Sequence, residues 1–415
     1  VCSVTPLEAM CLNGLLAGEG AFILHDGKST WHELENLELP TPQAAFDTAL
    51  AAYDLNPSKS DYPVSKLATT FLGATVEDGE PACCAEAIWN LERVLTEELD
   101  KQGMTALYRE IELPLCSVLY RMEKEGIAID QEQLAQFGQM LTQRIADCEK
   151  LIYSYSGEVF NINSTKQLGE LLFVKLGLPA IKKTKTGYST NADVLEKLKD
   201  KHPIIPAIMD YRMLTTLNST YADGLMKVIC DDGRIRTTFQ NLITATGRLS
   251  STEPNLQNIP IRTELGRELR RFFIPRSEKN VLIDADYSQI ELRLLAHFSG
   301  CKELIEAYCS GKDIHATTAA QVFGLPPEEV TPVLRSRAKA VNFGIVYGIS
   351  EFSLSEDIGV SRWEAKEYIE QRKWGVKQAE IDFKDIDPYK VEAGEVPEAS
   401  KDAPKKRGRK PKKVA

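Results

Sequence analysis

Several hallmarks of other protein classes are missing from this sequence of 415 residues. Its nine cysteines form no Cys-x-x-Cys pair, and Cys83 and Cys84 are adjacent and cannot easily bridge each other. No apolar run reaches the roughly 18 residues that cross a membrane, and no secretory signal is evident. We therefore expect a reduced cytoplasmic protein with no membrane partner.

The sequence also lacks an excess of positive charge. Its net charge is −10 and its pI is about 5.3, and taken alone these values argue against nucleic-acid binding. The distribution of charge matters more than its sum. We interpret one arginine-rich segment as a track for a phosphate backbone, with a solvated surface as the alternative; its members are Arg234, Arg236, Arg248, Arg262, Arg267, Arg270, Arg271 and Arg276.

Four side chains spaced by four residues carry the most information: Arg335, Lys339, Phe343 and Tyr347, which Gly348 follows. On an α-helix this spacing returns to one side, so two cations and two aromatic rings form a ridge about 18 Å long. A nucleoside triphosphate, anionic at one end and stackable at the other, matches that order. An amphipathic helix with a basic edge is the alternative.

The segment upstream of this ridge combines a strand signal with acidic residues. The apolar run 281–283 is suited to a buried strand and leads to Asp284 and Asp286. Ser288 and Glu291 then have the spacing of a helix capping box, and Gly300 can end that helix. A carboxylate at a strand end suits Mg²⁺, although a turn or N-cap aspartate is the alternative, and spacing alone does not choose between the two acids.

Together these motifs resemble family A DNA polymerases of the bacterial DNA polymerase I type. The residues that carry the resemblance are DYSQIELR at 286–293, RxxxKxxxFxxxYG at 335–348, TATGRLSS at 244–251, PNLQNIP at 254–260, FNINSTKQLGELLF at 160–173 and the Asp-Ile-His of 313–315. The resemblance covers roughly residues 40 to 372. It implies a DNA-directed DNA polymerase, a nucleotidyltransferase of DNA replication and repair, whose partners are primer-template DNA and deoxynucleoside triphosphates.

The resemblance assigns site roles residue by residue. It makes Asp286 the catalytic ligand of two Mg²⁺ ions and chooses it over Asp284, with the Tyr287 carbonyl as a further metal ligand. The catalytic cations are Lys339 and Arg335. The implied nucleotide-binding residues, in which Glu291 would reject ribonucleotides and Tyr347 would lie at the template base, are Gln289, Glu291, His315, Arg335, Lys339, Phe343 and Tyr347.

The same resemblance implies a DNA-binding set. Arg248, Gln257 and Asn258 are donors able to read minor-groove acceptors, which are nearly the same for every base pair. Solvated loop and turn chemistry are the alternatives for these three. The remaining DNA-binding candidates are Arg262 and, in a basic loop that could equally be plain surface, Lys183 and Lys185.

The implied fold is a multidomain α/β right-hand polymerase that acts as a monomer. We expect a partial, degenerate 3′–5′ exonuclease-like domain over 1–105, a thumb over 106–240, the first part of the palm over 241–300, fingers over 301–372 and a disordered, AT-hook-like tail over 373–415. Thr30 and Ala87 stand where loose matches to exonuclease motifs would place acids. Residues 1 to about 105 read as mixed α/β, and long helices are expected from about Thr105 to Lys124 and from Gln131 to Ser154. Asn163 and Ser164 can cap a third helix, and Asn191 can cap the helix after the basic loop. Ser361 and Glu364 have the spacing of a second capping box.

The resemblance stops after about Arg372, and the His-Asp-Glu of the family's third polymerase motif occurs nowhere in the sequence. One aspartate cannot position two metal ions, which would cost roughly a thousand-fold or more in rate. We therefore expect a truncated polymerase segment that is weak or inactive alone. A non-catalytic DNA-binding protein that keeps the thumb and tail contacts is the alternative, and a nucleotide-binding regulator is a third.

Overall fold

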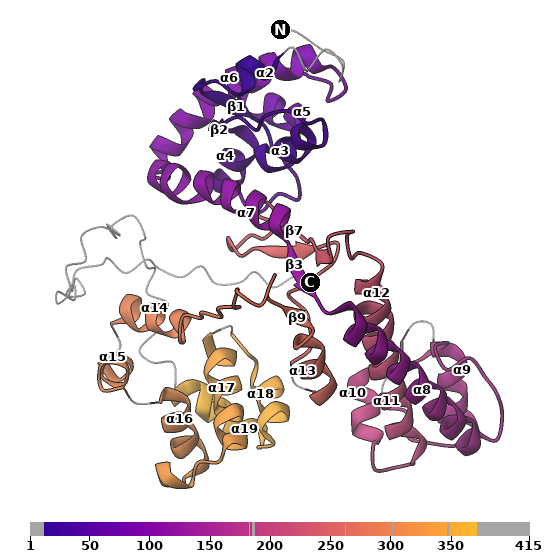
Figure 1. Cartoon of the computed structure of the whole chain (residues 1–415). Coiled ribbons are helices and arrows are strands. Elements are labelled where there is room, and N and C mark those ends of the chain that lie inside the picture. The colour runs from indigo at the N-terminus through magenta and orange to yellow at the C-terminus, as the bar shows by residue number, and fades with distance from the viewer. Residues whose placement is uncertain are drawn as a thin grey trace, which may run out of the picture. The chain divides into compact units, whose positions relative to one another are not determined.

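The computed structural model describes residues 12–371, apart from residues 182, 185, 186, 262, 301, 312 and 347. It divides into two compact units, of which unit 1 ends at Leu282 and unit 2 begins at Ile283. In Figure 1 unit 1 runs from indigo to salmon, and unit 2 runs from orange to yellow. The predicted AT-hook-like tail, residues 373–415, lies outside the described residues.

Unit 1 opens with an α/β lobe, here called the N-terminal lobe, which comprises residues 13–125. Strands β1 (Phe22–Leu24) and β2 (Ala44–Asp47) pair in parallel. Helices surround this pair, and they are α2 (Asn13–Leu16), α3 (Gly27–Asn36), α4 (Thr48–Leu55), α5 (Val64–Leu67), η2 (Ala68–Leu72), α6 (Pro81–Lys101), η3 (Leu107–Glu112) and α7 (Leu113–Glu125). The mixed α/β character predicted for the start of the chain is therefore present.

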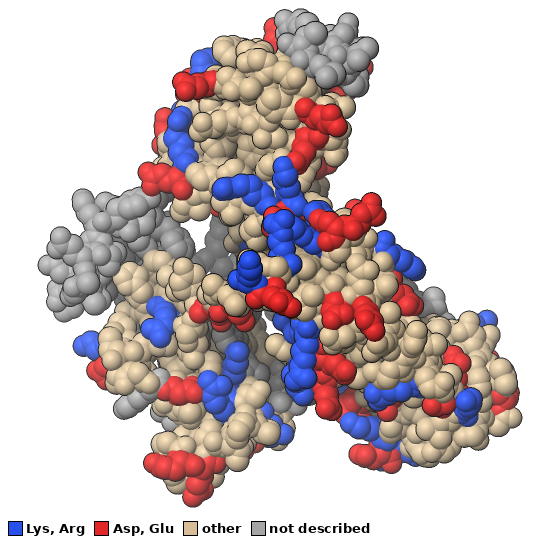
Figure 2. Space-filling model, viewed as in Figure 1, with Lys and Arg blue, Asp and Glu red and all other residues tan. Residues whose placement is uncertain are grey.

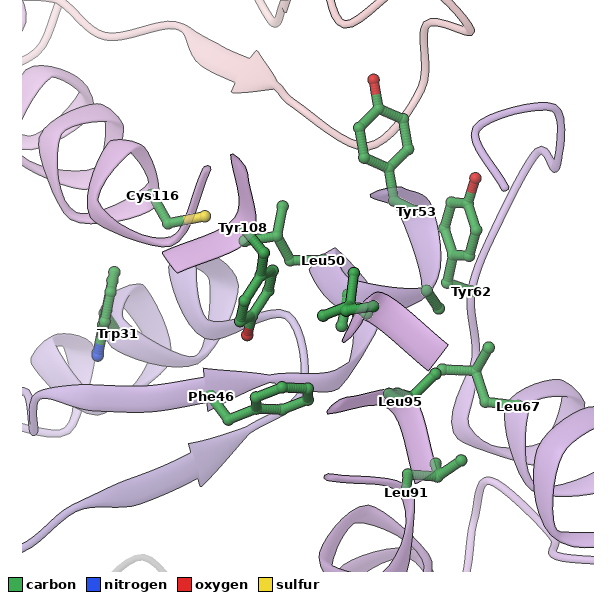
Figure 3. Close-up of a cluster of buried hydrophobic side chains, with 14 of the residues drawn as sticks. Trp31, Phe46, Leu50, Tyr53, Tyr62, Leu67, Leu91, Leu95, Tyr108 and Cys116 are labelled. Carbon is green, nitrogen blue, oxygen red and sulfur yellow. The ribbon is translucent and has the colours of Figure 1, made fainter. Parts of the chain in front are cut away.

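Helix α4 forms the centre of this lobe because its sequence is apolar on every side. Asp47 caps it by accepting hydrogen bonds from the amides of Ala49 and Leu50, and all residues from Thr48 to Asp54 are buried. Figure 3 shows the cluster around it, in which Leu50, Leu91 and Leu95 are fully buried. The same cluster takes in Tyr108, Cys116 and Tyr120, so its core continues past residue 105 into α7.

The middle of unit 1 is helical, as the sequence predicts. Helix α8 (Gln131–Ser156) confirms the long helix expected from Gln131, and Ser164 and Asn191 cap helices as the sequence indicates. The other elements are α9 (Thr165–Glu170), η4 (Leu171–Lys175), the strand pair β4 (Lys183–Thr184) and β5 (Gly187–Tyr188), α10 (Ala192–Leu198), α11 (Ile204–Thr216), η5 (Leu217–Ala222) and α12 (Asp223–Met226). Two apolar clusters fill the spaces between these helices.

Two small antiparallel sheets and one helix complete unit 1. One sheet has the order β6 (Arg234–Ile235), β3 (Ile127–Ile129), β9 (Phe273–Ile274). The other is a hairpin in which β7 (Thr238–Gln240) pairs with β8 (Ser250–Thr252). Helix α13 (Glu264–Arg270) begins at Thr263, whose side chain caps it. The hairpin connection, residues 241–249, carries most of the predicted TATGRLSS motif and is here called the hairpin loop.

The described part of unit 2 is helical. Its helices are α14 (Ile290–Ser299), α15 (Lys302–Cys309), α16 (Ile314–Phe323), η6 (Pro327–Glu329), α17 (Pro332–Val346), α18 (Glu351–Ile358) and α19 (Arg362–Gln371). The predicted capping box of α19 is confirmed, because the Ser361 amide donates to the Glu364 carboxylate and the Glu364 amide donates to the Ser361 hydroxyl. Gly300 ends α14 in the left-handed conformation, as expected.

Two local predictions for residues 281–291 are wrong. Val281, Leu282 and Ile283 form no buried strand: their exposed fractions are 75%, 55% and 86%. A strand needs a neighbour to satisfy its backbone, and none of the described strands pairs with this run. The capping box at Ser288 is also absent, because α14 begins one residue later, after a left-handed Gln289, and the Ser288 carbonyl accepts the Arg293 guanidinium instead.

Candidate nucleotide and nucleic-acid sites

An aspartate and an arginine join the start of α16 to the first turn of α17. Asp313 caps α16 by accepting from the amides of His315 and Ala316. Its second oxygen lies 2.5 Å from Nε of Arg335. The predicted phosphate-binding arginine is therefore fixed by a carboxylate, while its side chain stays 44% exposed.

Beneath this pair lies a buried polar network that sequence reasoning missed. His315 is 1% exposed, and its Nδ1 lies 3.0 Å from the amide nitrogen of Asn342. The amide oxygen of Asn342 accepts the hydroxyl of Thr318 at 3.0 Å. Because Asn342 is fully buried and follows Lys339 by three residues on α17, it ties the ridge helix to α16. The sequence signal that could have indicated Asn342 is its position three residues after Lys339 on the same helix.

The charges around this network shift two pKa values. Burial by itself raises the pKa of Asp313, but hydrogen bonds from Arg335 and from two backbone amides outweigh it and lower that pKa. Burial lowers the pKa of His315, and Arg335 and Lys339 lower it further against the opposing effect of Asp313. The imidazole is thus held in its neutral form, and Arg335 and Lys339 remain the cations of this surface.

Helix α17 carries the predicted ridge in part. Arg335, Lys339 and Phe343 lie on it at helical spacing, and the side chains of Arg335 and Lys339 are exposed. The side-chain position of Phe343 and the whole of Tyr347 lie outside what is described. The structure therefore confirms a helix with two neighbouring surface cations and leaves the aromatic half of the ridge as a prediction.

The segment before α14 displays the predicted acids without regular structure. Asp284 and Asp286 are exposed, and Tyr287 is 82% exposed. Gln289 is held in place, because its side-chain oxygen accepts the hydroxyl of Tyr308 at 3.0 Å. Glu291 is half-buried in the first turn of α14. Gln289 is thus positioned by a residue that sequence reasoning did not single out.

The acidic segment has limited capacity for a metal ion. No group of three or more His, Cys, Asp or Glu side chains suited to a metal occurs within the described residues. Mg²⁺ takes one or two protein carboxylates and completes its shell with water and substrate phosphates. The exposed Asp286 carboxylate and the Tyr287 carbonyl fit that mode, in which the nucleotide supplies the remaining ligands.

In unit 1 the three predicted minor-groove donors lie in or after the β7–β8 hairpin. Arg248 lies in the hairpin loop, and Gln257 and Asn258 follow β8; all three are exposed. The side-chain amide of Gln257 donates to the backbone carbonyl of Leu249 at 3.3 Å, and this hydrogen bond connects the hairpin loop to the segment after β8. The Asn258 carbonyl accepts the hydroxyl of Tyr221. Hydrogen bonds within unit 1 therefore fix the backbone that carries these three predicted donors.

Three arginines of the predicted track have acidic partners. Arg234 and Arg236 both pair with Asp232, and Arg234 and Arg276 both pair with Glu125. These acids neutralise part of the charge that a phosphate backbone would meet, and a phosphate-binding role for these three arginines stays a prediction. Figure 2 shows the resulting mixture of blue and red over the middle of unit 1.

Three basic candidates cannot be placed in full. Lys183 begins β4, and its side chain is not described. Lys185 and Arg262 lie outside the described residues. Their DNA-binding roles stay predictions. Within the described part of the chain, no helix is long and apolar enough to cross a membrane.

Comparison with known proteins identifies the class. The model of DNA polymerase family A matches residues 131–375, and relatives with more than 40% identity cover most of the chain. The chain therefore belongs to DNA polymerase family A, and the resemblance seen in its motifs is confirmed.

Three similar proteins illustrate the relationship. DNA polymerase I of Caldicellulosiruptor bescii is 46% identical over 364 residues, which are 87% of this chain and 43% of that protein. DNA polymerase I of Bacillus subtilis is 46% identical over 79% of this chain and 40% of its own length. The solved structure described as the POL domain of Pol1 from M. smegmatis in complex with DNA primer-template and dNTP is 40% identical, with a TM-score of 0.80 over 89% of this chain and 66% of that one. The chain thus spans less than half the length of these two curated relatives.

Proposed function

We propose that this chain serves template-directed DNA synthesis in replication and repair, in which a deoxynucleotide is added to a primer 3′ end. The observation that carries the proposal is the pair of exposed cations, Arg335 and Lys339, on one face of α17 in a member of DNA polymerase family A. The solved relative described with primer-template and dNTP supports the same partners.

In the proposed reaction the primer 3′-hydroxyl oxygen forms a bond to the α-phosphorus and releases its proton to water. The bond from the α-phosphorus to the oxygen that bridges to the β-phosphorus breaks, and pyrophosphate leaves. Positioning and charge stabilisation dominate such a transfer. Arg335 would bind phosphate oxygens as a planar donor, and Lys339 would act as a compact charge on the leaving group. Neutral His315 would donate a hydrogen bond from its ring to a phosphate oxygen of the nucleotide. Phe343 would stack near the sugar.

Asp286 and the Tyr287 carbonyl would hold Mg²⁺, and bound Mg²⁺ supplies Lewis-acid stabilisation of the transferring phosphate. Gln289 and Glu291 would then border the sugar of the nucleotide, where Glu291 rejects a 2′-hydroxyl. Tyr347 would lie at the template base. Arg248, Gln257 and Asn258 would read the minor groove of the primer-template duplex, and Lys183, Lys185 and Arg262 would contact its backbone.

The layout that goes with this function keeps the predicted domains: an exonuclease-like remnant without proofreading chemistry, a thumb, the first part of a palm and the fingers, in a monomer. Thr30 donates its hydroxyl to backbone carbonyls, and Ala87 packs with Val64 and Ala68. Neither residue can ligate a metal through a carboxylate, which favours a remnant without nuclease activity.

The 415 residues contain no His-Asp-Glu, so extension by this chain alone is proposed to be weak. The decisive experiment combines binding and extension by the purified full chain with Mg²⁺. Arg335→Ala should weaken nucleotide binding to the primer-template complex at least tenfold, the scale of a lost charge-assisted hydrogen bond. Arg337→Ala is the matched control, because Arg337 is an exposed arginine two positions along the same helix and faces elsewhere.

The outcomes separate the parts of the proposal. Absence of both DNA and nucleotide binding by the unchanged chain would contradict the proposed function. DNA binding that is indifferent to Asp286→Ala, without any nucleotide binding, would favour the non-catalytic DNA-binding alternative. Robust extension by the unchanged chain would retain the polymerase and overturn only the argument from the single carboxylate.

A further inference from the structure

The hairpin loop is held by the N-terminal lobe through side chains far away in the sequence. The hydroxyl of Tyr53 donates to the carbonyl of Thr244 at 2.7 Å. The Thr244 hydroxyl in turn donates to the carbonyl of Arg248 at 2.5 Å. A chain of two hydrogen bonds therefore runs from the central helix α4 to the backbone of the predicted minor-groove reader.

Tyr53 is well suited to act as an anchor. It is 4% exposed, and its ring meets the ring of Tyr62 edge to face at 5.9 Å. In Figure 3 the hydroxyl of Tyr53 points away from the apolar cluster, and it donates to the Thr244 carbonyl of the hairpin loop. A rigid ring packed at this angle fixes the position of its hydroxyl at little cost in side-chain freedom. The hydrogen bond to the Thr244 carbonyl then fixes the position of the loop relative to the ring.

Two further contacts attach the same hairpin to α7. The Phe239 amide donates to Glu123 at 2.6 Å, and Glu123 is itself 5% exposed and paired with Lys28. The Asn241 side chain donates to the sulfur of Cys116 at 3.3 Å. The lobe thus binds the hairpin at β7, at the start of its loop and at Thr244. No regular secondary structure lies between Asn241 and Leu249 to order the loop.

We propose that the Tyr53 hydroxyl is a positioning group for DNA recognition: it holds the hairpin loop in the conformation in which Arg248 meets primer-template DNA. The N-terminal lobe then serves as a scaffold for the duplex-reading loop. This inference rests on the proposed function, since it needs Arg248 to contact DNA. It concerns Tyr53, Thr244 and the lobe, to which the motifs assign no part in DNA binding.

The test is a double-mutant cycle on the full chain with a primer-template duplex, measured by DNA affinity. Tyr53→Phe keeps the ring and removes only the hydroxyl, and it should weaken binding about fivefold, the scale of one hydrogen bond. In the Arg248→Ala background the same change should have little effect, because a group that acts through Arg248 has nothing left to position. Tyr62→Phe is the control, since its hydroxyl donates to Asn56 within the lobe.

Amide hydrogen exchange over residues 241–249 supplies a readout that needs no DNA, and faster exchange in Tyr53→Phe than in Tyr62→Phe supports the anchor. Equal affinities for these two variants, or additive effects of Tyr53→Phe and Arg248→Ala, would overturn the inference while DNA binding itself stands. An unchanged chain that binds no duplex at low salt would instead overturn the proposed function, and the inference with it.

Discussion

Asp313 and Arg335 form an ion pair with an Oδ2–Nε distance of 2.5 Å, and Asp313 also caps α16. One carboxylate therefore makes both an ion pair and a helix cap, because its other oxygen accepts hydrogen bonds from the backbone amides at the start of α16. Substitution can remove the charge alone, or the charge and the cap together.

Asp313→Ala should destabilise the chain by about 1 kcal/mol through loss of the cap, and it should leave Arg335 without its carboxylate. Asp313→Asn should retain most of the stability, because asparagine is an equally good N-cap, yet it removes the negative charge. Urea unfolding of the two variants measures the difference. Equal destabilisation would show that the ion pair, and not the cap, is the main stabilising interaction.

The pH dependence of this pair has a definite sign. The pKa of Asp313 is lowered in the folded chain, so its stabilising contribution is present above the ordinary aspartate pKa and is lost as the pH falls through the lowered value. Asp313→Asn should flatten the acid limb of the stability curve. The measurement is the free energy of unfolding from pH 6 down to pH 3, and an unchanged acid limb would contradict the assignment.

The sequence predicted correctly those features that depend on neighbouring residues in the chain. The helix spacing of Arg335 and Lys339, the caps at Ser164 and Asn191, and the capping box at Ser361 all depend on neighbours within four residues. Helical spacing and capping are rules of that range, so a single sequence contains the information.

The sequence did not predict features that depend on contacts between residues distant in the chain. The apolar run 281–283 predicts a strand, yet strand formation depends on a partner that no local pattern specifies. The acids that pair with Arg234 and Arg276 include Glu125, which lies more than 100 positions away in the sequence. Asn342 and Tyr53 were missed for the same reason, because their roles come from contacts with His315 and Thr244.

Asn342 offers a further test of the site. Asn342→Leu keeps the approximate volume but removes the hydrogen-bond partner of His315 and of Thr318, and it leaves their polar groups buried. We expect a loss of about 1–3 kcal/mol in the free energy of unfolding. Nucleotide binding should fall with it, because the α16–α17 contact sets where Arg335 and Lys339 lie. Asn342→Asp keeps an acceptor for the Thr318 hydroxyl but buries a carboxylate, so it should also destabilise the chain at neutral pH.

Glu123 should be among the most sensitive positions in unit 1. It accepts Lys28 at 2.8 Å, His32 at 2.6 Å and the Phe239 amide, all within the fold. Glu123→Gln leaves the Lys28 ammonium buried without its counter-charge, which typically costs about 3–5 kcal/mol. Thermal unfolding measures this. Glu98→Gln, which breaks the exposed pair with Lys101, should cost less than about 1 kcal/mol, and comparable losses in both variants would refute the difference.

Asp54 should make the N-terminal lobe less stable at high pH. The residue is 7% exposed, and its Oδ2 atom has no hydrogen-bond partner within the described residues. Burial and, to a smaller extent, the charge of Glu112 raise the pKa of Asp54 to about 7. An aspartate with a raised folded pKa binds more protons when folded, so stability falls as the pH rises from about 4 to about 7 and is constant above. Asp54→Asn removes the charge and should stabilise the chain at pH 8 by up to about 4 kcal/mol, since each pKa unit corresponds to about 1.4 kcal/mol.

The gain from Asp54→Asn should shrink toward zero at pH 4.5, where the native carboxyl is already protonated. Asp61→Asn is the matched control, because that aspartate is exposed and pairs with Lys66 on the surface. Unfolding curves at pH 4.5 and pH 8 for both variants give the comparison. A gain that is the same at both pH values would mean that shape or packing, and not the buried charge, accounts for the effect of Asp54→Asn.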